Sequence, residues 1–206
     1  MMKKLGLNNE DELQCCFMNR INDYCAGKNK QAFMWSWDLK DDKLLSANLG
    51  FTKCGDINTG GRPFIDTSSK AYYIDLPYGY ISLKDTANHK LYDGNCLGAE
   101  ATLWTEYVPN MKKADKMTYP RLGAMCETVW RGENSYEQFH NKLDYYYSYL
   151  DKNRIGYSKL YFANPNRALG FLQRIWFEKR QLTWEGLANI FDDLKVKYIA
   201  KKNSNL

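Results

Sequence analysis

The sequence predicts an α/β protein built from strand–helix units, and two segments carry this prediction. Residues 97–107 (LGAEATLWTEY) are small and apolar until Trp104 and Glu106, as expected of a buried strand with an aromatic ring and a carboxylate at its C-terminal end. Residues 119–130 (YPRLGAMCETVW) place Pro120 at a helix start, with an apolar face of Leu122, Met125, Cys126 and Val129. Together they indicate one βα unit of a barrel.

The remaining elements follow from caps, breakers and apolar runs. Asn9 and Glu12 form a capping-box pattern that opens a helix ending at Gly27, with one face formed by Leu13, Phe17, Ile21 and Tyr24. Strands are predicted at 32–37, at 43–48, at 63–67 and in the segment ending at Trp104. Capped helices are predicted from Ser135 to Leu150, from Asn164 onward and from Thr183 onward.

The composition excludes several classes of function. The chain has 206 residues, 44% of them hydrophobic, which is enough for one globular core but short for a complete TIM barrel of ~250 residues. Its net charge of +5 owes part of the excess to a C-terminal lysine cluster, which indicates a solvated helix end rather than a nucleic-acid site. The N-terminus lacks the apolar stretch of a signal peptide or membrane anchor, so a cytoplasmic protein is expected.

The cysteines argue against a metal site. Six of them occur without a CxxC pair, and the chain has two histidines, so neither zinc nor another cofactor is predicted. Reduced and buried thiols are the expectation.

Aromatic and acidic residues follow the predicted strands. Aromatic rings stack on the C–H faces of sugars and carboxylates accept from their hydroxyls, and strand ends of a barrel converge on one pocket. The alternative for any single residue is that the ring belongs to the core and the acid is solvated or caps a helix. The candidate binding residues are Trp37, Phe51, Tyr73, Asp75, Trp104 and Glu106.

Two of these motifs carry a family resemblance. GAEATLWTEY followed by YPRLGAMCETVW resembles the last strand and last helix of the β-N-acetylhexosaminidases, glycoside hydrolase family 20. The resemblance implies a partial (β/α)8 TIM barrel, about strands 5 to 8 with their helices, over residues 1–157. Residues 158–206 would then form a helical C-terminal extension.

The resemblance also implies roles for the candidates. Trp37 in Ser-Trp-Asp matches the pocket tryptophan after strand five, and Phe51 is the nearest match to a second one after strand six. Tyr73 matches the tyrosine that hydrogen-bonds the acetamide carbonyl of the substrate, with Asp75 as its neighbouring acid. Trp104 matches the floor of the sugar pocket, and Glu106 matches the carboxylate that binds hydroxyls distant from the reacting carbon.

The family mechanism is substrate-assisted and retaining, because the 2-acetamido oxygen of the sugar attacks its anomeric carbon. An adjacent Asp-Glu pair after strand four orients the acetamide and protonates the leaving oxygen, and its matching region would precede Met1. Asp11-Glu12 is an adjacent pair, but its place in a helix first turn favours a structural role at the positive end of the helix dipole. No catalytic residue is therefore assigned, and this chain alone is expected to be inactive.

The implied ligands are glycosides of N-acetylglucosamine or N-acetylgalactosamine. Two alternatives stay open: a non-catalytic amino-sugar-binding module, or one half of a split enzyme with a separately encoded N-terminal half. Half a barrel would have two open sheet edges, so self-association is possible, and neither nucleic acid nor membrane is an expected partner.

Overall fold

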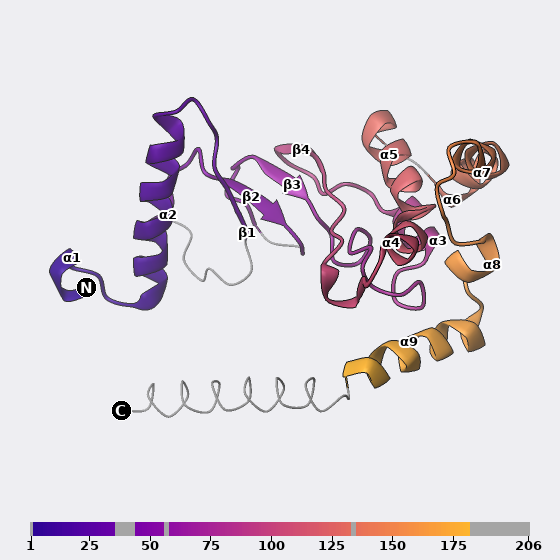
Figure 1. The fold of residues 1–206 in the computed structure, drawn as a ribbon. Helices are drawn as coiled ribbons and strands as arrows, with labels where there is room; N and C mark the ends of the chain where they lie inside the picture. The colour runs from indigo at the N-terminus through magenta and orange to yellow at the C-terminus, as the bar shows by residue number, and fades with distance from the viewer. Residues whose placement is uncertain (1, 36–43, 56–57, 133–134, 182–206) are drawn as a thin grey trace.

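A computed structural model describes residues 2–35, 44–55, 58–132 and 135–181 of the chain. Its centre is a sheet of four parallel strands in chain order, which confirms the predicted α/β class with a parallel sheet (Figure 1). The strands are β1 (Phe33–Trp35), β2 (Gly50–Lys53), β3 (Phe64–Asp66) and β4 (Cys96–Ala99). The helices are α1 (Met2–Leu5), α2 (Glu10–Ala26), α3 (Leu83–Asn88), α4 (Met111–Thr118), α5 (Arg121–Arg131), α6 (Tyr136–His140), α7 (Leu143–Lys152), α8 (Leu160–Ala163) and α9 (Arg167–Gln181), with the short 3-10 helix η2 (Thr105–Tyr107).

Helix α2 begins and ends as predicted. The side chain of Asn9 accepts a hydrogen bond from the backbone N–H of Glu12 at 2.9 Å, and Gly27 is the C-cap. The predicted inward face was wrong, because Phe17 and Tyr24 are exposed. The face toward the sheet holds Cys15, Met18, Asn22 and Cys25 instead.

Two asparagines, Asn19 and Asn22, explain why the apolar period of α2 predicted the wrong face. Asn22 donates to the side chain of Asn48 at 2.9 Å, and the Asn19 side chain donates to Leu44 O at 2.7 Å and accepts from Ser46 N at 2.8 Å. These hydrogen bonds hold residues 44–48 against α2, so polar side chains occupy positions that a hydrophobic period assigns to solvent.

The strand predicted at 43–48 was also wrong, because the strand is β2 at Gly50–Lys53. The described part of the predicted strand ends in a turn, in which the N–H of Leu49 donates to Ser46 O at 3.0 Å. Gly50 can begin a strand here because the ring of Phe33 covers it: a Cβ on Gly50 would lie 2.5 Å from Phe33 Cδ1.

The segment predicted as a buried strand up to Trp104 is partly an exposed edge. β4 ends at Ala99, and Leu97 is 58% exposed. This follows from its position, because β4 has a neighbour on one side only within the described residues.

The two faces of the sheet differ in their cover. Met34, Phe51 and Phe64 share one face, where they pack with Cys15 of α2; we call this the helix-covered face. Phe33, Trp35, Thr52 and Ile65 share the other, which we call the open face. Figure 1 shows α2 alongside the sheet, with α3–α8 gathered beyond it.

A second core joins the helices that follow β3. Leu83, Ala87, Ala124, Phe139 and Leu143 bury one another between α3, α5, α6 and α7. Ser135 caps its helix as predicted, accepting from Gln138 N at 3.3 Å, but the predicted helix to Leu150 is divided into α6 and α7 by a turn at 141–142. The prediction of buried thiols fails at Cys126, which is exposed.

Arg121, at the start of α5, is fully buried and connects α5 to the loop after β3. Its guanidinium donates to the backbone carbonyls of Leu76 and Ile81, each at 3.0 Å, to Ile74 and to Met117. These carbonyls compensate the cost of burying the charge. The helix predicted from Thr183 lies outside the described residues, and within them no helix has the length and apolarity to cross a bilayer.

Candidate functional site

The segment after β4 runs beside the segment after β3. Thr102 forms an isolated parallel bridge with Tyr73. The N–H of Ile74 donates to Thr102 O and the N–H of Thr102 donates to Tyr72 O, each at 2.9 Å. These bonds bring the side chains beyond the carboxyl ends of β3 and β4 to one place.

Three aromatic rings meet there. The ring centroid of Trp104 lies 5.6 Å from that of Trp35, at the end of β1, and 6.4 Å from that of Tyr73. Trp104 is 40% exposed and the other two rings are half-buried. The group, called here the aromatic group, is therefore accessible enough to stack on a ligand and packed enough to be held in place.

Two carboxylates accompany the aromatic group. Asp75 is buried, and burial raises the pKa of its carboxyl to about 6; the nearby charge of Glu106 acts in the same direction, and Arg121 opposes it. Within the described residues, Asp75 Oδ1 has no hydrogen-bond partner. Glu106 is exposed on η2, the short helix that begins immediately after Trp104. A buried acceptor without a partner is costly, so Asp75 is suited to accept from a ligand.

Tyr73 provides a donor at the same place. Burial raises its pKa to about 12, with the charges of Cys54 and Asp75 adding to the effect. The hydroxyl therefore keeps its proton at neutral pH and can donate to a carbonyl oxygen. No set of three or more His, Cys, Asp or Glu side chains suited to a metal occurs in the part of the chain that the structure describes.

The structure brings four of the six predicted binding residues together: Tyr73, Asp75, Trp104 and Glu106. It does not bring Phe51 to them. Phe51 is 2% exposed on the helix-covered face, packed in the core with Met34 and Phe64, because its position in β2 alternates with that of Thr52 on the open face. Trp37 lies outside the described residues.

Trp35 and Arg121 were not among the residues predicted from the sequence. Trp35 stands two residues before Trp37, and positions two apart in a strand share a face, so strand periodicity could have identified it. Arg121 follows Pro120 at a helix start, and no role was predicted for it. An arginine at the first position of a helix that carries an apolar face was the available signal.

The family model described as "Glycosyl hydrolase family 20, catalytic domain" matches residues 71–133 of this chain. These residues include Tyr73, Asp75, Trp104 and Glu106. Among curated proteins, a "Beta-hexosaminidase" of Porphyromonas gingivalis is 26% identical over 185 residues, covering 76% of this chain and 23% of the relative. The chain thus spans about a quarter of that relative's length.

Solved structures resemble the fold. An exo β-N-acetylglucosaminidase from Vibrio harveyi in complex with N-acetylglucosamine superimposes with a TM-score of 0.65 at 18% identity, covering 78% of this chain and 29% of that one. A β-N-acetylhexosaminidase from Bacteroides fragilis gives a TM-score of 0.61 at 18% identity, covering 80% of this chain and 40% of that one. At such identities the likeness is one of fold.

The family model matches the segment that carries the site, and the fold is similar to that of solved family members. The resemblance seen in the sequence is confirmed: the glycosyl hydrolase family 20 model matches residues 71–133, and the chain is similar in sequence to a β-hexosaminidase and in fold to a solved β-N-acetylglucosaminidase.

Proposed function

We propose that this chain forms the C-terminal half of a β-N-acetylhexosaminidase barrel and carries the wall that binds the terminal amino sugar. The observation that carries the proposal is the aromatic group beside Asp75 and Glu106, at the carboxyl ends of four parallel strands in chain order. Active sites of (β/α)8 barrels lie at this end of the strands. The four strands would be numbers 5 to 8 of such a barrel.

Each side chain has a role that its geometry supports. Trp104, with Trp35 beside it, offers a flat face for the C–H surface of the sugar. The hydroxyl of Tyr73 donates to the acetamide carbonyl oxygen, which holds that oxygen for attack on the anomeric carbon in a substrate-assisted, retaining reaction. Asp75 and Glu106 accept hydrogen bonds from sugar hydroxyls.

The reaction also needs a general acid, and Asp11-Glu12 does not supply one. Glu12 stands in the first turn of α2, where its carboxylate accepts from Asn8 N and Asn8 Nδ2, each at 2.8 Å. Both residues therefore serve the helix start. We infer that these 206 residues alone bind the sugar without turning it over.

A titration tests the binding wall. The purified chain should bind N-acetylglucosamine with a change in tryptophan fluorescence, and Trp104→Ala should weaken binding by about tenfold, the value of a lost stacking contact. Trp130→Ala is the matched control, because Trp130 is 88% exposed on α5, outside the site. A flat titration of the unaltered chain would reject the binding wall.

A turnover assay tests the missing acid. The chain alone should release no chromophore from a chromogenic N-acetylglucosaminide. Release that Glu106→Gln abolishes would contradict the proposal, since it would require a complete active site in this chain.

Asp75 favours a second candidate, a split enzyme completed by another polypeptide. Among the residues that the structure places, nothing hydrogen-bonds the buried Oδ1 of Asp75, and such a carboxylate is unfavourable in a chain that never meets its ligand. Under this candidate, hydrolysis appears when the chain is mixed with a polypeptide that supplies a strand followed by Asp-Glu. A chain that binds sugar but stays inactive in such mixtures is instead a non-catalytic sugar-binding module.

A further inference from the structure

Helix α9 lies outside the segment that the family model matches, yet it contacts the turn that carries Glu106. The ring of Phe177 packs edge-on against Tyr107, with centroids 4.8 Å apart, and against Tyr80 at 6.0 Å. Tyr107 is the last residue of η2 and follows Glu106 directly. One ring of α9 therefore stands behind a carboxylate of the proposed sugar site.

Two further contacts fix α9 in this position. The hydroxyl of Tyr80 donates to Glu178 Oε1, one residue beyond Phe177. Gly79 meets the backbone of α9 so closely that a Cβ there would overlap the carbonyl oxygen of Gly170 and lie 3.1 Å from Gln173 Cβ. Position 79 therefore needs a glycine because α9 approaches so closely. The backbone angles of Gly79 do not need one, since its φ is outside the left-handed region.

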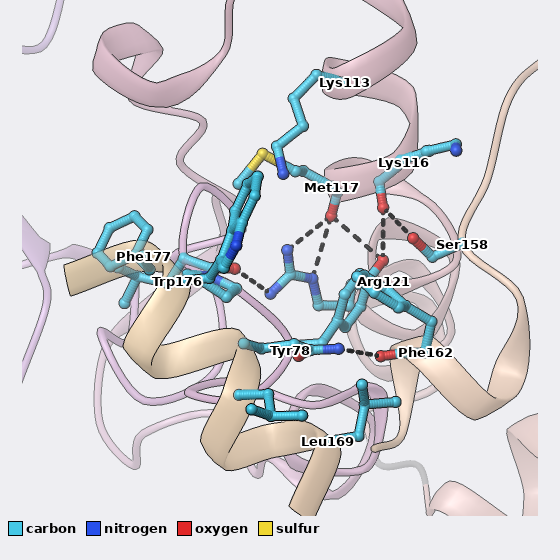
Figure 2. A pocket seen from close by; sticks show the side chains of 14 residues that line it. Tyr78, Lys113, Lys116, Met117, Arg121, Ser158, Phe162, Leu169, Trp176 and Phe177 are labelled. Carbon is cyan, nitrogen blue, oxygen red and sulfur yellow. Dashed lines mark hydrogen bonds between the residues drawn. The ribbon is translucent and has the colours of Figure 1, made fainter. Parts of the chain in front are cut away.

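The pocket between α9 and α4 contains Arg121, which binds the backbone on both sides of Asp75. It has a volume of about 410 Å³ and is lined by Trp176 and Phe177 of α9 and by Arg121; Figure 2 shows Trp176 reaching from α9 toward Arg121. Arg121 holds the carbonyls of Ile74 and Leu76, which flank Asp75 in the chain. Phe177 thus packs against Tyr107 of η2, and Arg121 binds the segment 74–76, so two residues that line one pocket support the two carboxylates.

We propose that α9 is a positioning element of the sugar site, with Phe177 as the residue that holds η2 and thereby the orientation of Glu106. This inference rests on the proposed sugar-binding function. Phe177 does not touch the sugar; it acts through Tyr107. A packed ring restricts the small rotations of a short turn, and a binding carboxylate displaced by a fraction of an ångström loses much of its hydrogen-bond energy.

Substitutions at two glycines test the docking of α9. Gly79→Ala forces the helix away, whereas Gly170→Ala is the control, since its Cβ would meet Gly79 Cα at an ordinary 3.7 Å. Amide exchange at 105–108 should accelerate in Gly79→Ala and in Phe177→Ala, but not in Gly170→Ala or Phe171→Ala, a second control at an exposed site on the same helix.

Affinity for N-acetylglucosamine gives the functional result. Phe177→Ala and Gly79→Ala should weaken binding about threefold to tenfold, while the urea midpoint of the sheet stays unchanged. Phe177→Tyr should bind as tightly as the unaltered chain, because the aromatic ring is kept. Unchanged affinity and unchanged exchange in both variants would overturn the inference. If the unaltered chain binds no N-acetylglucosamine, the proposed function fails, and the exchange at 105–108 alone decides whether α9 holds the turn.

Discussion

The two faces of the sheet have opposite fates in this chain. On the helix-covered face, Phe51 and Phe64 are buried against Cys15 of α2. On the open face, Phe33, Trp35 and Ile65 are half-buried, and the aromatic group forms where this face meets the strand ends. Stability is thus concentrated on one face and the proposed binding chemistry on the other. In a closed barrel the open face would be the interior.

The largest expected effect is on the helix-covered face. Phe51→Ala should lower the free energy of unfolding by about 3–5 kcal/mol, because it removes a fully buried ring and leaves a cavity. Urea denaturation followed by circular dichroism measures it, with the exposed Phe171→Ala as the control. A small loss of stability together with a loss of sugar affinity would show that Phe51 belongs to the pocket and not to the core. The two faces of the sheet would then not differ in function.

A smaller effect is expected on the open face. Gly50→Ala should cost about 1–3 kcal/mol, because its Cβ would lie 2.5 Å from Phe33 Cδ1 and the ring must leave its rotamer. Gly55→Ala is the matched control, since no atom of the other described residues, apart from its chain neighbour, lies within 4 Å of a Cβ placed there. Equal stability of the two variants, measured by urea midpoint, would show that the Phe33 ring moves freely and that the open face is loosely packed.

The sequence predicted the parts of the fold that local chemistry decides. Asn9 and Ser135 cap their helices through side-chain oxygens, and Pro120 marks the start of α5, because a cap depends on a few neighbouring residues. The four grouped site residues were predicted because they follow β3 and β4 in recognisable motifs. Their roles in sugar binding stay predictions.

The errors arose where tertiary contacts outweigh local pattern. The inward face of α2 depends on Asn19 and Asn22 binding residues 44–48, which no hydrophobic period encodes. Gly50 belongs to a strand because the Phe33 ring covers it. The division at residue 157 stays a prediction, although Gly79 and Gly170 show close packing across it.

The smallest predicted effect is a pH dependence that originates at the site. The pKa of Asp75 is raised to about 6 by burial, against about 3.9 for an unfolded aspartate. Between these values the folded chain binds more protons than the unfolded one, so stability should fall as pH rises from about 4 to about 6. After allowance for solvent screening the loss is on the order of 1 kcal/mol.

Asp75→Asn isolates this contribution. The variant should lose the decline between pH 4 and pH 6 and be more stable than the unaltered chain at pH 7, since no charge is buried. Asp93→Asn, at an exposed carboxylate, should keep the decline. Urea midpoints across that range measure both. If stability still declines in Asp75→Asn, the decline comes from another group. If the decline disappears, the site keeps the buried Asp75 carboxylate at a cost to stability, as binding sites do.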